Sequence, residues 1–340
     1  MLSVSSQPQQ TLKPTWACRL VGGRVSHIGI DIGIDRVKVA TLGSPRGRSE
    51  PGLQWVAQSE FPLPVDPQKP SPENWLELVV EQLQKRLPRC VFGNQNFAWI
   101  SIPLPWIHYQ TTTRADLESS RSQCDAMFEA SLFQSRSHIV HWPIASDTDS
   151  LVVAATAHDA SLRVAEAIGK IGYDVQGVVP HGVALINAAS TLTSLTPTAV
   201  LLLEQTGGLI TLRNHNSIGL CRSLPALRHS EDGFPTRDVL DPWLREVSSE
   251  VNATIRYAAR QGDQIDTDSP ILLCGEVAHR KGIDNDLATL IGRPVATWRY
   301  AGRNRPANQT SIFDPNASDS SMAVSLSLAC SGLCELGANR

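Results

Sequence analysis

The chain has 340 residues, a length that corresponds to about two domains. Hydrophobic residues make up 41% of the chain and charged residues 19%, so the apolar material can fill sizeable cores and is too abundant for a disordered acidic segment. Acidic residues number 33 and basic residues 30, and the resulting net charge of -3 excludes a strongly basic nucleic-acid-binding protein.

The first 26 residues and the apolar runs bear on export and membrane insertion. Residues 1–26 are rich in Ser, Gln and Pro and lack the apolar stretch of a secretory signal, so we expect a disordered tail and a protein that is not exported. The longest apolar runs, such as residues 199–203, fall well short of the roughly 20 residues of a membrane helix. We therefore predict no transmembrane span.

Neither the cysteines nor the histidines form a recognisable metal-binding or catalytic pattern. The cysteines are odd in number and include no Cys-x-x-Cys pair, which indicates reduced thiols rather than disulfides or a zinc site. His181 and the other histidines are expected to be ordinary core or surface residues. The sequence thus predicts no metal site and no catalytic residue. The seven cysteines are Cys18, Cys90, Cys124, Cys221, Cys274, Cys330 and Cys334.

The first half of the chain begins with a strict alternation. In residues 28–35 isoleucine occupies every even position, which predicts a strand that runs into a tight turn, and a second strand follows at 37–42. Ser71 and Pro72 are expected to begin an amphipathic helix, and Gly172 is expected to end another. We further expect strands at 97–102, 106–113, 138–142, 151–156 and 175–179, and helices at 115–132, 160–171 and 182–189.

The second half repeats this order. Asp241 and Pro242 are expected to begin a long amphipathic helix. Strands are expected at 199–203, 209–212, 217–222 and 270–274, and a final apolar helix at 322–336. Because a hairpin followed by further strands and helices occurs in each half, the sequence predicts a duplicated, two-lobed α/β fold with a cleft between the lobes.

Three turns are candidates for ligand-binding chemistry: residues 31–35, 204–208 and 274–278. A hairpin with Asp and Gly at its tip can direct backbone N–H groups at a phosphate, and its acid can hold a water bound to Mg²⁺. Two such hairpins facing each other clamp a nucleotide, and a Gly-rich turn before a helix can approach the adenosine. Alternatively, Gly and Asp occur in hairpin turns for conformational reasons alone.

The order and spacing of these segments resemble the actin-like PilM family of type IV pilus assembly proteins and, more distantly, the cytoplasmic part of the type II secretion protein GspL. The first hairpin, Ile28 to Val39, is similar to that family's first phosphate hairpin. Residues 151–189, LVVAATAHDASLRVAEAIGKIGYDVQGVVPHGVALINAA, are the most specific match. Further similar segments are EVNATIRY (250–257), ILLCGEVA (271–278) and MAVSLSLACSGL (322–333), which correspond to a Glu-led helix, the adenosine turn and the closing helix.

The resemblance covers about residues 27–336 and implies an actin-like, ribonuclease H-like fold in two duplicated lobes. It implies a disordered tail at 1–26 and a first lobe at 27–195 with an inserted subdomain at about 97–180. A second lobe at 196–320 and a C-terminal helix at 321–340 that returns to the first lobe complete the expected organisation.

The resemblance also implies a nucleotide site, from which this sequence departs. The family has small hydroxyl residues after the first glycine, where this chain has residues 34–36, Ile-Asp-Arg. Glu204 replaces the acid of the second hairpin, and Gly275 is the one glycine kept from the adenosine turn. We expect these changes to weaken nucleotide affinity by several orders of magnitude, which leaves ATP with Mg²⁺ as a possible but not a firm cofactor. The implied weak or vestigial nucleotide-binding residues are Asp31, Gly33, Lys38, Glu204, Gly207, Gly208, Glu250 and Gly275.

In the PilM family the partner is the cytoplasmic N-terminal peptide of the membrane protein PilN, which docks as an extended segment beside the inserted subdomain. The resemblance therefore implies a cytoplasmic scaffold, peripheral at the inner membrane, in the assembly platform of a type IV pilus or type II secretion system. A PilN-like protein is the expected partner, with the assembly motor ATPase as a possible second one. Trp99 and Trp106 are candidate docking residues; alternatively, both are ordinary core residues.

Two other functions stay open. The chain could be an active ATPase or sugar kinase of the actin superfamily, which requires an Asp base and intact phosphate hairpins. It could also be an actin-fold scaffold of an unrelated envelope complex.

Overall fold

A computed structural model describes residues 25–43, 54–63, 72–87, 95–113, 115, 137–143, 150–214, 217–227, 235–261, 266, 268–301 and 319–337. The first strand begins at Val25, two residues inside the segment expected as a disordered tail. Residues 1–24, nearly all of the helix expected at 115–132 and residues 302–318 lie outside the described residues.

Five strands form the sheet of the first lobe in the order β3-β2-β1-β4-β8. The strands β1 (Val25–Ile32), β2 (Arg36–Gly43) and β3 (Gln54–Pro62) are antiparallel neighbours. Next to β1, the strands β4 (Gln95–Ser101) and β8 (Asp174–Val178) continue the sheet in parallel.

The alternation in β1 places its two sets of side chains on opposite faces of this sheet. Ile28, Ile30 and Ile32 pack in one cluster with side chains of the helices α2 (Pro72–Arg86) and α5 (His158–Lys170). The intervening Gly29 and Asp31 lie on the other face, where Gly29 meets residues 325–329 and Asp31 meets His181. Helix α5 is followed by Gly172 with a φ of 102°, as the sequence predicts.

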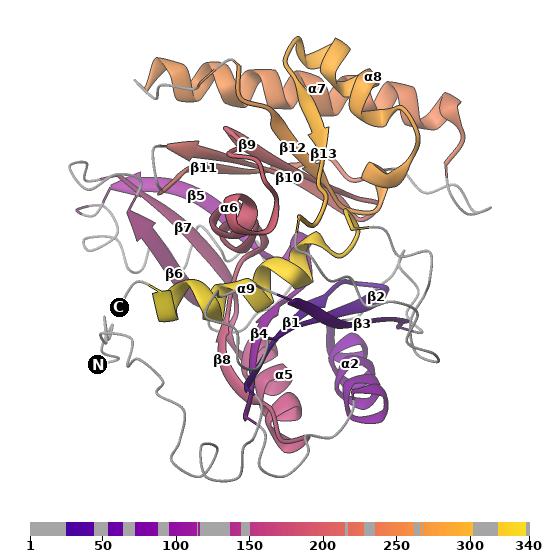
Figure 1. Cartoon of the computed structure of the whole chain (residues 1–340), viewed down its shortest axis with the longest axis vertical. Helices are drawn as coiled ribbons and strands as arrows, with labels where there is room; N and C mark the ends of the chain where they lie inside the picture. The colour runs from indigo at the N-terminus through magenta and orange to yellow at the C-terminus, as the bar shows by residue number, and fades with distance from the viewer. Residues whose placement is uncertain are drawn as a thin grey trace.

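The second lobe has the same topology. Its strands lie in the order β11-β10-β9-β12-β13, where β9 (Ala199–Glu204), β10 (Gly207–Asn214) and β11 (Ser217–Leu224) are antiparallel. The strands β12 (Ile271–Cys274) and β13 (Val295–Thr297) are parallel to β9. The helices α7 (Arg237–Arg260) and α8 (Ile283–Ile291) cover the outer face of this sheet, as Figure 1 shows.

Two helices are exchanged between the lobes. Helix α6 (His181–Leu192) follows β8 of the first lobe but packs on β9, β10 and β11, whereas α9 (Ala323–Gly337) follows β13 of the second lobe but packs on β1, β2 and β4. The two helices also pack against each other between the sheets (Figure 1), where they form a continuous buried cluster. Each lobe is therefore completed by a helix that belongs to the other half of the chain.

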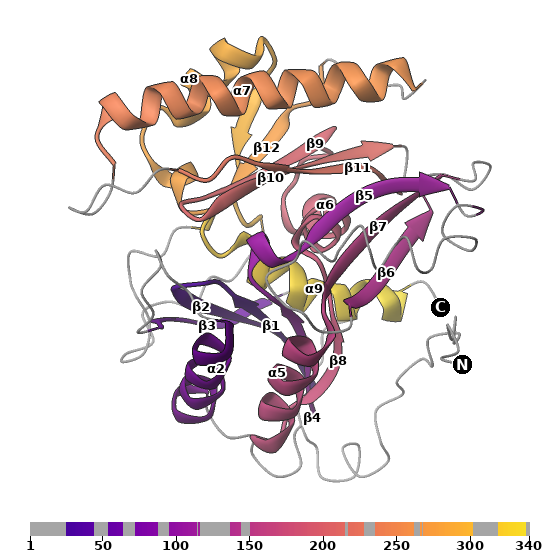
Figure 2. The ribbon, with the colours of Figure 1, turned by 180° about the vertical axis from the view of Figure 1, so that it is seen from behind.

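A third sheet is inserted between β4 and β8. Its strands β5 (His108–Thr113), β6 (Ser137–Pro143) and β7 (Ser150–Ala157) are antiparallel in the order β5-β7-β6 and lie beside α6 and β11 (Figure 2). The inserted sheet is narrower than the expected range of about 97–180, because β4, β8 and α5 belong to the sheet and core of the first lobe.

Two expected boundaries were wrong. Helix α7 begins at Arg237 rather than at Asp241, so Pro242 lies inside it, where its missing N–H leaves the carbonyl of Asp238 without its helical donor. Trp106 lies in the short 3-10 helix η1 (Leu104–Trp106) rather than in a strand. None of the helices in the described ranges combines the length and the apolar character that a membrane crossing requires.

The exchange of α9 depends on a glycine in β1. A Cβ atom on Gly29 would clash with the carbonyl oxygen of Ser325 and lie 2.6 Å from the backbone nitrogen of Ala329. We expect Gly29→Ala to lower the free energy of unfolding by about 2 kcal/mol or more, because backbone atoms of α9 must move. Denaturant unfolding measures this loss. Gly169→Ala in α5 is the matched control, since its Cβ would meet nothing within 4 Å, and an equal loss in both variants would contradict the packing argument.

Candidate functional site

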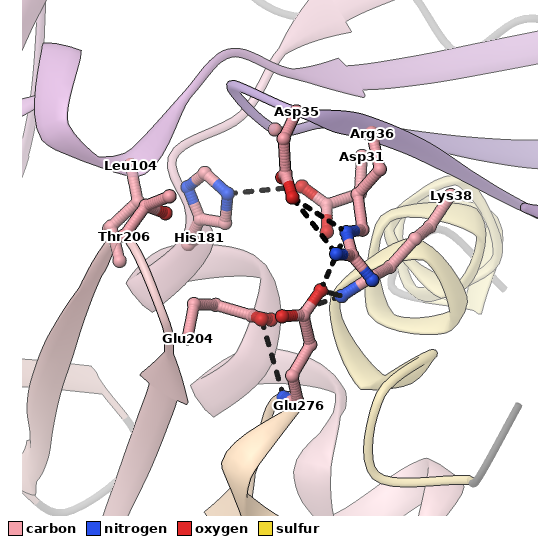
Figure 3. A pocket seen from close by; sticks show the side chains of 10 residues that line it. Asp31, Asp35, Arg36, Lys38, Leu104, His181, Glu204, Thr206 and Glu276 are labelled. Atoms are coloured by element: carbon pink, nitrogen blue, oxygen red, sulfur yellow. Dashed lines mark hydrogen bonds and ion pairs between the residues drawn. The ribbon is translucent and has the colours of Figure 1, made fainter. Parts of the chain in front are cut away.

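The turn between β1 and β2 faces the turn between β9 and β10 across the cleft between the lobes. A small cavity lies between them, and Figure 3 shows the side chains around it. The exchanged helix α6 supplies His181 at its first residue, and the turn after β12 supplies Glu276. The lining residues are Asp31, Gly33, Asp35, Arg36, Lys38, Leu104, His181, Glu204, Thr206 and Glu276.

Two cations of the first lobe pair with two acids of the second lobe. Lys38 Nζ lies 3.2 Å from Glu204 Oε1 and 3.3 Å from Glu276 Oε1, and Arg36 Nε lies 3.0 Å from the same Glu276 oxygen. The backbone N–H of Glu276 donates to Glu204 Oε2 at 3.3 Å. Because Lys38, Glu204 and Glu276 are largely removed from solvent, these pairs are less screened than surface ion pairs. We call Arg36, Lys38, Glu204 and Glu276 the inter-lobe charge cluster.

Arg36 is also held by acids of its own lobe. Its guanidinium donates to Asp35 at 2.9 Å and to Glu60 of β3 at 3.2 Å. Burial alone would lower the pKa of Arg36, but the charge of Glu276 and the interactions with Asp35 and Glu60 raise it above its ordinary value. Arg36 is therefore a fixed cation whose orientation is set by three carboxylates.

Asp31 links the first sheet to the exchanged helix α6. Its Oδ1 accepts a hydrogen bond from Ser101 Oγ at 2.8 Å and lies 3.1 Å from His181 Nε2. Burial alone would raise the pKa of Asp31, but the interaction with His181, the charge of Lys38 opposite it in the β1–β2 ladder and the Ser101 hydroxyl lower it. Asp31 is thus held as a carboxylate in the cleft.

Burial acts in opposite directions on the two ends of the Lys38–Glu204 pair. Desolvation alone would lower the pKa of Lys38, yet the charges of Glu204, Glu276 and Asp31 raise it above its ordinary value. Desolvation raises the pKa of Glu204 to about 8, with Glu276 and Asp31 adding to the shift and Lys38 opposing it. Glu204 is therefore the member of the inter-lobe charge cluster that can change its protonation state near neutral pH.

The residues around the cavity do not fit a nucleotide in this arrangement. The cavity has a volume of about 30 Å³, enough for one or two water molecules, whereas ligand pockets measure roughly 300–1,000 Å³. Acidic side chains of Asp31, Asp35 and Glu276 line it and would repel phosphate oxygens, and the cations in the lining, Arg36 and Lys38, are already paired with acids. Within the described ranges, no group of three or more His, Cys, Asp or Glu residues could hold a metal ion.

The structure brings together four of the eight residues implied for a nucleotide site: Asp31, Gly33, Lys38 and Glu204 line the cavity. Gly275 directly precedes Glu276 and has a φ of 98°, and a Cβ there would clash with the carbonyl of Leu203. This glycine is thus required by the fold itself.

The remaining implied residues lie outside the cavity lining. Gly207 and Gly208 begin β10, where Gly207 pairs with Glu204. Glu250 lies on the outer helix α7 and forms an ion pair with Arg222 of β11 at 2.6 Å. The structure therefore does not bring Glu250 together with the hairpin residues.

Both candidate docking tryptophans are buried. Trp99 is 5% exposed and packs against His27, with ring centroids 5.6 Å apart. Trp106 is 3% exposed and meets Trp75 edge to face at 4.2 Å. Their positions fit the alternative that they are core residues, and neither side chain forms a surface anchor in this arrangement.

His181, Arg36 and Glu276 line the cavity but were not among the residues expected at the site. His181 was expected to be an ordinary residue, and its partner Asp31 lies 150 positions away along the chain. Arg36 and Glu276 stand where the family has small residues and glycine. The available signal was that side chains of opposite charge stand in or next to two of the three candidate turns.

Two lobes with the same five-stranded topology, an inserted sheet in the first lobe and a cleft between the hairpins define the actin-like, ribonuclease H-like fold, which confirms the expected fold class. The structure is similar to a chain of the PilM–PilN type IV pilus biogenesis complex, with a TM-score of 0.60 and 16% sequence identity over 91% of this chain and 99% of that chain. The expected resemblance in fold to PilM is thereby confirmed.

Two other solved structures show lower similarity. One is the ethanolamine utilization protein EutJ from Carboxydothermus hydrogenoformans, with a TM-score of 0.49 and 12% identity over 94% of this chain and 90% of that chain. The other is the cytoplasmic domain of EpsL, an inner membrane component of the type II secretion system of Vibrio cholerae, with a TM-score of 0.40 and 7% identity over 91% and 94%. No family model and no curated protein matches the chain.

The raised pKa of Glu204 predicts a specific dependence of stability on pH. Between its ordinary value of 4.5 and about 8, the folded protein keeps a proton that the unfolded chain releases. The free energy of unfolding therefore falls as the pH rises through this range. Above about pH 8, Glu204 is ionised in both states and causes no further decrease. The glutamine of Glu204→Gln does not titrate. Between pH 5 and pH 8, we therefore expect the free energy of unfolding to fall by about 1 kcal/mol more in the wild type than in this variant.

Urea unfolding at several pH values measures the difference. Lys38, Glu276 and Asp31, which face Glu204, are the same in both proteins, so the difference between the curves reports Glu204 together with its effect on these neighbours. Parallel curves for the two proteins would contradict the assignment.

Proposed function

We propose that this chain is a PilM-like scaffold in the inner-membrane assembly platform of a type IV pilus or related type II secretion system. The observation that carries the proposal is the similarity in fold to a chain of the PilM–PilN complex, which extends over nearly the full length of both chains. By this proposal the chain works at the cytoplasmic face of the inner membrane. It binds the N-terminal cytoplasmic peptide of a PilN-like protein and thereby connects that protein to the assembly motor ATPase.

The charge cluster supports a scaffold rather than an enzyme. A scaffold needs lobes that keep their relative position, and ion pairs across the cleft supply that constraint without turnover of a ligand. We also propose that the nucleotide turns are vestigial and that the scaffold works without ATP.

The alternative function is an active ATPase or sugar kinase of the actin superfamily. One observation favours it: Asp31 is held as a carboxylate in the cleft, where such enzymes need an acid. Against it stand the small volume of the cavity and the carboxylates that line it.

We expect the chain to bind a synthetic peptide that comprises the cytoplasmic N-terminus of the PilN-like protein of the same organism, with a Kd of about 10 µM or lower. Fluorescence anisotropy with a labelled peptide measures the affinity. A peptide of the same composition in scrambled order is the control. No binding by the intended peptide to the folded chain, or equal binding by both, would contradict the proposed partner.

Binding of Mg-ATP distinguishes the proposed scaffold from the alternative enzyme. Ligands that bind only the folded state raise Tm, so a nucleotide at 100 times its Kd would add about 2.7 kcal/mol to the free energy of unfolding. We expect the thermal unfolding midpoint to stay the same in Mg-ATP up to millimolar concentrations. A saturable rise of several degrees would instead favour the ATPase or kinase.

A further inference from the structure

The side chain of Glu276 occupies the point where the two lobes meet. It comes from the turn after β12 in the second lobe, and its exposed side-chain fraction is only 9%. A single oxygen, Oε1, lies 3.0 Å from Arg36 Nε and 3.3 Å from Lys38 Nζ, both on β2 of the first lobe. Figure 3 shows this carboxylate directed at the two cations.

Arg36, Lys38 and the Glu276 carboxylate are arranged like an anion-binding site with its anion bound. Arginine and lysine that converge on one oxygen are the donors that proteins use to bind phosphate or carboxylate groups. Here the anion is covalently part of the chain. The carboxylate therefore stays between the cations without any free ligand in solution. Its position is fixed by the turn at Gly275, whose N–H donates to Ser320 O at 2.8 Å.

We propose that Glu276 is a built-in ligand that closes the cleft in place of a nucleotide, so that the closed arrangement of the lobes is intrinsic to this chain. The proposal does not rest on the proposed pilus partner. It follows from the disagreement between the fold, which implies a nucleotide at this cleft, and the side chains that fill it.

The other charges around the cleft support this role of Glu276. Asp35 and Glu60 orient Arg36 from within the first lobe, and they stay in place when Glu276 is removed. Of the inter-lobe ion pairs described here, only that of Lys38 with Glu204 then remains. Asp31 and His181 are a second link, because α6 packs on the second sheet while Asp31 belongs to the first. Glu276 is the carboxylate that contacts both first-lobe cations, and its removal should therefore loosen the cleft most.

The distance between the lobes tests this directly. Leu162 on α5 of the first lobe and Tyr257 on α7 of the second lobe are each 49% exposed, so both can be replaced by cysteine and spin-labelled without disturbing a core. The buried Cys221, Cys274 and Cys330 can stay. The other native cysteines are replaced by serine; they are Cys18, Cys90, Cys124 and Cys334.

Pulsed electron spin resonance then reports the distribution of distances in the protein without nucleotide. We expect one narrow distribution for the parent protein. In Glu276→Ala we expect a broader distribution whose mean is longer by at least about 3 Å, because Arg36 loses its carboxylate from the second lobe and Lys38 keeps only Glu204 there. Glu276→Gln keeps the size of the side chain and removes its charge, and it should change the distribution in the same direction if Glu276→Ala does not fold.

The matched control is Glu250→Ala, which removes a glutamate that is paired with Arg222 within the second lobe. This control should leave the distribution unchanged and cost little stability, whereas Glu276→Ala should lower Tm by roughly 5 °C or more. A narrow, unshifted distribution in both Glu276 variants would overturn the proposal, as would a parent protein that is broadly distributed and becomes narrow only when Mg-ATP is added.

Discussion

A carboxylate of one lobe that is held between two cations of the other lobe is the interaction on which the closed cleft depends. The Lys38 side chain is largely removed from solvent, and a buried charge is tolerated only when it is paired, whereas the partly exposed Arg36 adds a second cation to the same carboxylate oxygen. Glu276 supplies the pairing from the opposite lobe. The cations of the first lobe are therefore paired with an anion of the second lobe, in a position where other two-lobed proteins bind an anionic ligand.

The duplication of the fold brings these groups together. Each half of the chain builds the same five-stranded sheet, and the exchanged helices α6 and α9 pack between the two sheets. The β1–β2 and β9–β10 hairpins consequently face each other. Gly29 permits this arrangement, because any side chain there would enter the backbone of α9. The position of the charge cluster is thus a consequence of close backbone packing elsewhere.

The fold was largely predictable because its signals are local. Alternating isoleucines define β1, Gly172 ends α5, and the repeated order of elements indicates two lobes. Local signals also misled: Asp241 and Pro242 resemble a helix start, yet apolar side chains before them, such as Leu240, are buried, and packing extends α7 by a turn.

The site was only partly predictable because its contacts are non-local. Asp31 and Glu204 could be named from the candidate turns and Lys38 from the family resemblance, but no spacing rule connects Asp31 with His181, or Arg36 with Glu276. Trp99 and Trp106 illustrate the same limit, since an aromatic residue in a sequence carries no mark of whether its ring packs inside or outside. Burial, which is decided by the whole fold, separates the two cases.

The most direct measurement of the central claim is a crystal structure of the full chain grown with Mg-ADP at millimolar concentration. The account predicts that the Glu276 carboxylate stays between Arg36 and Lys38 and that no electron density for a nucleotide lies in the cleft. A nucleotide phosphate bound by these two cations, with Glu276 turned away from them, would contradict it.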